Sequence, residues 1–105
     1  MSNYIFIESQ DPFESRDPKF VEDMAIALKK RGHNVTVFLV QNGVLATRTE
    51  SLARLTSAGV SLLADDFSLR ERGIQPDEIL PGVQSVALTV LVAALVQEQT
   101  KAMWH

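Results

Sequence analysis

Cysteine is missing from this chain of 105 residues. Its absence excludes disulfides, thiolate zinc sites, iron–sulfur ligation and thiol nucleophiles. Positive charge is also sparse: 10 Lys and Arg against 13 Asp and Glu give a net charge of −3. Because nucleic acids and anionic membranes recruit basic surfaces, we expect neither as a partner.

Long apolar runs are lacking as well. The longest, from Val86 to Val96, is interrupted only by Thr89 and falls well short of the roughly 20 residues that span a bilayer. The first residues, MSNYIFIESQ, show neither the basic leader nor the cleavage site of a signal peptide. These features predict a cytoplasmic protein.

Strand-like and helix-like segments alternate along the sequence. β-branched and aromatic runs predict strands at 4–8, 34–40, 60–64, 83–87 and 101–105. Apolar residues at helical spacing and helix-ending signals predict helices at 17–31, 50–58, 66–72 and 88–98. Such alternation through short connections is typical of a parallel sheet with helices on both faces. We expect one α/β domain over residues 1–105, a three-layer α/β/α structure with a five-stranded parallel sheet.

Local signals refine this prediction. Asp17 and Pro18 have the residue types of an N-cap and a first helical position. The segment QNGVLATR (41–48) is predicted to be a loop in which Gly43 supplies a positive φ.

The last predicted helix is apolar on nearly all sides, since ten of the eleven residues from Val86 to Val96 are apolar. A helix of this kind must be buried on more than one side, whereas the sheet of a small domain covers only one. We therefore expect another subunit to cover helix 88–98. The alternative is that 86–92 extends the fourth strand and the helix is short.

Ligands of open parallel α/β sheets bind beyond the carboxyl ends of the strands. The residues that follow the predicted strands form a polar rim there, comprising Glu8, Ser9, Gln10, Asp11, Gln41, Asn42, Gly43, Asp65, Asp66 and Thr89. From this rim we select Ser9, Asp11, Asn42, Gly43 and Asp66 as candidate cleft residues.

The segment QNGV (41–44) does not match a phosphate-binding loop. The acidic pair Asp65-Asp66 has three interpretations. One carboxylate caps the following helix. Or the pair binds a divalent metal or accepts a phosphoryl group, as in receiver domains, although the long loop before Asp17 and the position of Lys101 argue against a receiver. Or the pair performs acid–base catalysis. Against this, the side chains of adjacent residues at a helix start normally point in different directions, so they do not share a proton. His33 and His105 show no serine–histidine–acid spacing.

Several segments together resemble the DsrE/DsrF-like family, which includes the TusD and TusB groups of sulfur-relay proteins. They are ALKKRGHNVTVFLVQNGV, LTSAGVSLLADDFSLRERGI, GVQSVALTVLVAALVQEQ and KAMWH, in this order. The resemblance implies a five-stranded α/β/α domain that assembles as trimers or hexamers. It also implies a frame, A-C-x-x-x-L-x-x-R-G, in which a cysteine carries sulfur as a persulfide. In this chain Asp65 occupies the position of that cysteine, and Ser68 occupies the position of a second family cysteine.

A carboxylate cannot form a persulfide, because sulfur transfer needs a thiolate. The resemblance therefore implies a cysteine-free, non-enzymatic oligomeric protein without a cofactor, acting as a subunit or partner in sulfur relay. Its expected partners are further copies or related DsrE/F-like subunits through helix 88–98, and a sulfur-carrier protein. The alternative is a diverged protein that binds a small molecule or divalent metal through carboxylates at the strand ends.

Overall fold

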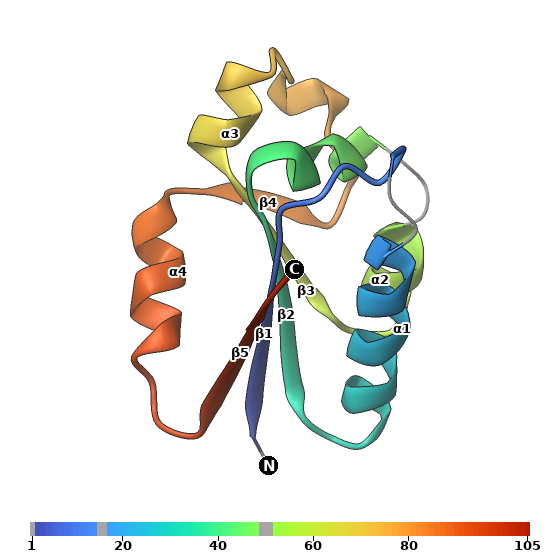
Figure 1. Cartoon of the computed structure of the whole chain (residues 1–105), viewed down its shortest axis with the longest axis vertical. Coiled ribbons are helices and arrows are strands. Elements are labelled where there is room, and N and C mark those ends of the chain that lie inside the picture. Colours follow the sequence, from blue (N-terminus) through green and yellow to red (C-terminus); the bar gives the residue numbers. More distant parts are fainter. Residues whose placement is uncertain (1, 15–16, 49–51) are drawn as a thin grey trace.

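The protein is described here by a computed structural model covering residues 2–14, 17–48 and 52–105. Five strands form one parallel sheet in the order β4-β3-β2-β1-β5 (Figure 1). They are β1 (Asn3–Glu8), β2 (Asn34–Leu39), β3 (Ser61–Asp65), β4 (Val83–Val86) and β5 (Thr100–Trp104). Each bound lies within one residue of its prediction. The expected five-stranded parallel α/β fold is confirmed.

The helices connect these strands. The α-helices are α1 (Asp17–Lys30), α2 (Ala53–Ser57), α3 (Asp66–Glu71) and α4 (Leu88–Leu95), and the described residues also include the 3-10 helices η1 (Gln41–Arg48) and η3 (Pro76–Glu78). The predicted loop over 41–48 is therefore wrong, because this segment is η1. The first part of the helix predicted at 50–58 and the side chain of Asp17 lie outside the described residues.

Helix α4 ends three residues before the predicted bound at 98. Val96 is its C-cap, and Gln97 N–H donates to the Ala94 carbonyl in a tighter closing turn. Gln99 then adopts a positive φ of 58°, which turns the chain into β5. The alternative in which 86–92 extends the fourth strand is excluded, since β4 ends at Val86.

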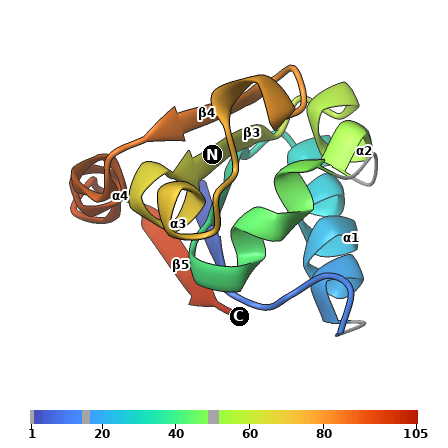
Figure 2. The ribbon, with the colours of Figure 1, turned by 90° about the horizontal axis from the view of Figure 1, so that it is seen from above.

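The direction of each crossover decides which face of the sheet a helix covers. From β1 through β3 the chain moves across the sheet in one direction, and α1 and α2 lie on one face. From β4 it returns past β3, β2 and β1 to reach β5, so a right-handed connection places α4 on the opposite face. Figure 2 shows α1 and α2 on one side and α4 on the other. The predicted helices on both faces are confirmed.

Alternating strand residues divide the core between the two faces. On the side of α1 and α2, Val37, Leu39 and Leu62 pack with Val21 and Leu55. On the other side Ile5, Ile7, Phe38 and Val40 pack with Leu91 of α4. The first cluster is much the larger, so the face under α4 is less completely covered. In the described part of the chain, no helix is long and apolar enough to cross a bilayer.

Candidate functional site

The carboxyl ends of β1, β2 and β3 meet at one edge of the sheet because the strands are parallel. Glu8 is paired with Leu39, and Leu39 with Ala64, the residue before Asp65. Helices η1 and α3 leave from this edge and pack against each other. The predicted rim is thus assembled from segments far apart in the sequence.

Asp65 caps helix α3. Its backbone is extended, with φ −67° and ψ 119°, and its Oδ2 accepts a hydrogen bond from the Ser68 N–H at 3.1 Å. The Ser68 hydroxyl donates to the same Oδ2 at 2.7 Å. Both residues are buried, and Oδ1 of Asp65 has no hydrogen-bond partner among the described residues. The capping interpretation of the acidic pair is confirmed for Asp65.

Ser68 also binds the start of η1. Its Oγ accepts a hydrogen bond from the backbone N–H of Gln41 at 2.9 Å. Gln41 has a positive φ of 50°, a conformation that a non-glycine residue seldom adopts. The Ser68 hydroxyl therefore joins the cap of α3 to the turn at the end of β2.

Arg72 makes a second connection between these helices. Its Nε donates to Oδ1 of Asn42 at 3.1 Å, and its Nη1 donates to the Ser68 carbonyl at 3.3 Å. Asn42 is exposed, whereas Arg72 is half-buried. The candidate cleft residue Asn42 is thus held beside Ser68 through a guanidinium group.

Asp66 is the first residue of α3 and is only partly buried. Asp65 and Asp66 differ in their surroundings, since the carboxylate of Asp65 lies inside the fold. Any basic segment that approached this edge would meet Asp66 and not a pair of carboxylates. The site is therefore less acidic at its surface than the sequence DD implies.

Ser9 and Asp11 belong to a different part of the rim. The backbone N–H and the hydroxyl of Ser9 donate to the His105 carbonyl at 2.8 and 2.9 Å. Oδ1 of Asp11 accepts from the Phe13 N–H at 2.8 Å, which closes a local turn. These two candidate residues stabilise the loop after β1 and the end of β5.

Gly43 lies between these two parts of the rim. A positive φ was the predicted reason for a glycine at this position. Positive φ values occur at Gln41 and at other glycines, and Gly43 is not among them. A Cβ at Gly43 would instead overlap the Glu8 carbonyl oxygen. The predicted positive φ is wrong, because here glycine allows η1 to pack directly on the backbone of β1.

A histidine–carboxylate pair at this edge was not predicted. Nδ1 of His105 lies 2.7 Å from Oε2 and 3.1 Å from Oε1 of Glu8, a glutamate that is only 4% exposed. The two residues are 97 positions apart, so no sequence spacing could reveal them. The only available signal was the inward position of Glu8 on a strand whose alternate residues face the core.

The remaining candidate positions lie apart from these contacts. Thr89 is exposed on α4. His33 Nδ1 accepts from the Ser2 N–H at 3.1 Å, and its ring stacks edge-on against Tyr4, which is a structural role. Among the described residues, no three His, Cys, Asp or Glu side chains come together as a metal site would require.

Fold and site define a single-domain α/β protein with a five-stranded parallel sheet, whose edge carries a carboxylate-capped helix. Solved structures share this fold at low sequence identity. The ychN protein from E. coli superposes with a TM-score of 0.84 at 20% identity, over 98% of this chain and 100% of that one.

Two proteins described as being of unknown function are also similar. MTH1491 from Methanobacterium thermoautotrophicum gives a TM-score of 0.78 at 22% identity, with both chains covered in full. BT1422 from Bacteroides thetaiotaomicron gives 0.80 at 13% identity, over 99% of this chain and 95% of that one. No family model and no curated protein matches the sequence. The likeness thus establishes the fold.

Proposed function

We propose that this protein is a non-catalytic, oligomeric subunit or partner in a sulfur-relay system of the DsrE/DsrF type. The observation that carries the proposal is the hydrogen bond between Asp65 and Ser68. These residues occupy the two positions where the resemblance places sulfur-carrying cysteines. The shared fold of ychN and the other neighbours supports the same assignment.

The chemistry of the site follows from this replacement. A relay cysteine must present a thiolate that attacks a sulfane sulfur. Here a buried carboxylate is engaged with the backbone and hydroxyl of Ser68, and a carboxylate has no sulfur with which to form the sulfur–sulfur bond of a persulfide. The frame around the site is kept while its nucleophile is replaced. The protein would therefore act through its surface, by binding a sulfur-carrier protein or related subunits.

The variant Asp65→Cys tests whether this site is a former sulfur site. After exposure to inorganic polysulfide, the introduced thiolate should take one sulfane sulfur, leaving a polysulfide one atom shorter and a protein persulfide that mass spectrometry detects. The Ser68 N–H that now binds Asp65 would stabilise the thiolate. The control is Ser57→Cys, at an exposed serine at the end of α2. Equal labelling of both variants would contradict a specialised site.

Partner binding needs its own measurement. The wild-type protein should bind an immobilised sulfur-carrier protein, and Asp66→Asn should weaken that binding because Asp66 is the carboxylate nearer the surface. Asp65→Asn should have less effect.

A thermal-shift screen with Mg²⁺ and Mn²⁺ tests the alternative metal-binding function, since a ligand with concentration far above its Kd raises the melting temperature. A clear shift with either ion would argue against the scaffold role.

A further inference from the structure

The sheet face under α4 is too wide for one helix to cover. Five strands about 4.8 Å apart make a sheet roughly 19 Å wide, whereas a helix with its side chains is about 10–12 Å across. Leu91 of α4 packs over β1 and β2, against Ile5, Ile7, Phe38 and Val40. Leu63 of β3 and Val86 of β4 pack against the edge of this cluster and are only partly buried, so the beginnings of β3 and β4 extend beyond it.

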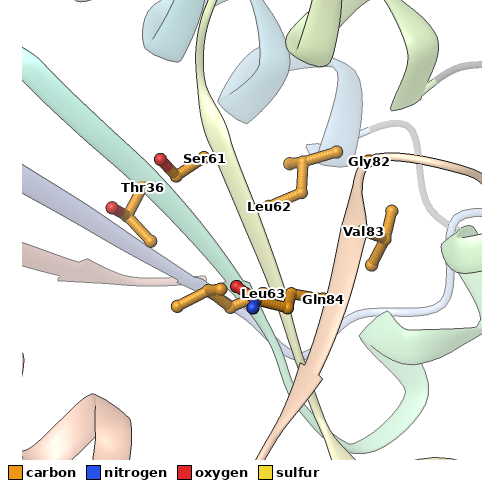
Figure 3. Close-up of a pocket in the computed structure, with 7 residues that line it drawn as sticks. All are labelled: Thr36, Ser61, Leu62, Leu63, Gly82, Val83 and Gln84. Atoms are coloured by element: carbon orange, nitrogen blue, oxygen red, sulfur yellow. The ribbon is translucent and has the colours of Figure 1, made fainter.

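This uncovered strip contains a groove of about 550 Å³. It runs across the beginnings of β3 and β4 and the neighbouring part of β2, as Figure 3 shows. Thr36, Ser61, Leu63 and Gln84 line it from the α4 side of the sheet, and none of its lining residues is charged. An uncharged sheet surface of this kind accepts an apolar element without leaving a buried ion.

Helix α4 presents an exposed apolar stripe of its own. Leu88, Val92 and Val96 are 52%, 55% and 79% exposed, and their spacing of four residues places them on one side of the helix. At about 100° per residue the stripe lies roughly a quarter-turn from Leu91, on one flank. Val90 lies on the other flank. The helix carries no charged residue between Leu88 and Leu95.

We propose that the stripe of Leu88, Val92 and Val96 packs into the groove over β3 and β4 of a second copy of this chain. This inference rests on the oligomeric state in the proposed function and specifies its contact. A second copy is the occupant because each chain offers both an uncharged apolar stripe and an uncharged groove on the same face. Packing one against the other removes exposed apolar surface from both copies. Since stripe and groove are different patches, the contact can repeat around a ring.

Engineered cysteines test the contact directly, because the natural chain has none to interfere. Ser61→Cys protein mixed with Val92→Cys protein should form a disulfide-linked pair under mild oxidation. The matched control is Val90→Cys, which places the same substitution on the opposite flank of α4. A crosslink between positions 61 and 92 without one between positions 61 and 90 is expected. Equal yields, or no crosslink with Val92→Cys, would overturn the proposal.

Light scattering gives an independent measurement. The wild type should be larger than a monomer at micromolar concentration, and Val92→Asp should reduce its mass to that of one chain. Val90→Asp should leave the assembly intact. If both variants dissociate equally, the stripe is not the contact and the proposal is wrong. An intact oligomer without the crosslink would reject this contact alone, whereas the persulfide test of Asp65→Cys is unaffected by either result.

Discussion

The Ser68 hydroxyl donates a hydrogen bond of 2.7 Å to Oδ2 of Asp65 while its oxygen accepts one from the Gln41 N–H. One buried hydroxyl thus connects the end of β2, the end of β3 and the start of α3. The proposed function assigns a family cysteine position to each of Asp65 and Ser68.

Ser68→Ala should lower the free energy of unfolding by about 1–3 kcal/mol, because it removes the hydroxyl that donates to the buried Oδ2 of Asp65 and accepts from the Gln41 N–H. Urea unfolding monitored by circular dichroism measures this change. Ser57→Ala, at an exposed serine of α2, should stay within about 0.5 kcal/mol of the wild type. Similar losses for the two variants would show that the Ser68 hydroxyl has no special role.

Gly43→Ala should be strongly destabilising, since the added Cβ overlaps the Glu8 carbonyl oxygen and η1 must move off β1. Overpacking of this kind costs about 1–3 kcal/mol, occasionally more. Gly73→Ala provides the comparison: its Cβ meets open space, and only a positive φ of 67° opposes it. That strain costs about 1–2 kcal/mol. The melting temperature of Gly43→Ala should therefore be lower than that of Gly73→Ala. The reverse order would contradict the close-packing explanation.

Glu22 gives a prediction about pH. Burial raises the pKa of its carboxyl above the ordinary value of 4.5, the Arg54 guanidinium opposes this, and Asp23 adds to it. The folded state therefore binds the Glu22 proton more tightly than the unfolded state. This contribution to stability is present at acid pH and is lost as the pH rises from 4.5 through the raised pKa.

Glu22→Gln should remove this loss of stability with rising pH. The difference in unfolding free energy, variant minus wild type, should become more positive between acid and neutral pH. Urea titrations across this interval measure the difference. Parallel pH profiles for the two proteins would show that burial of Glu22 has no effect on folding.

His105→Ala should destabilise the protein by about 1–3 kcal/mol, because it deprives the buried Glu8 carboxylate of a hydrogen-bonding partner. Lys101→Ala in the same strand region removes an exposed contact of the ammonium with the Tyr4 ring at 5.7 Å and should cost about 0.5–1 kcal/mol. Urea unfolding of both variants tests the ranking. Equal effects would mean that the Glu8–His105 pair contributes no more than a surface contact.

The sequence predicted the sheet well because each strand is a short apolar or β-branched run between clear breaks. NVTVFL, for example, alternates between the two cores and becomes β2 with its predicted start. The helix cap at Asp65 was also predictable, since an acidic residue before a short helix has a local physical cause. The strands and the helix cap were recovered from such local signals, whereas η1 was predicted to be a loop.

Features that depend on contacts between distant segments were missed. Gly43 looked like a turn glycine because a sequence does not show that the Glu8 backbone lies against it. The Glu8–His105 pair required the knowledge that β5 returns to β1. Arg72 is the arginine of the A-C-x-x-x-L-x-x-R-G frame, yet its hydrogen bond to Asn42 depends on how α3 packs on η1.

The return of β5 to the side of β1 sets a condition on folding. Asn3 is paired with Thr100, so this contact closes a loop of nearly the whole chain, which is slow compared with the β1–β2 pairing. Until it forms, β1 has one unpaired edge, and Ile5, Phe6 and Ile7 lie along it. An apolar open edge is a template for association with other chains. A nascent chain in which residues 100–104 have not yet emerged would carry this hazard at the strand that becomes the interior of the finished sheet.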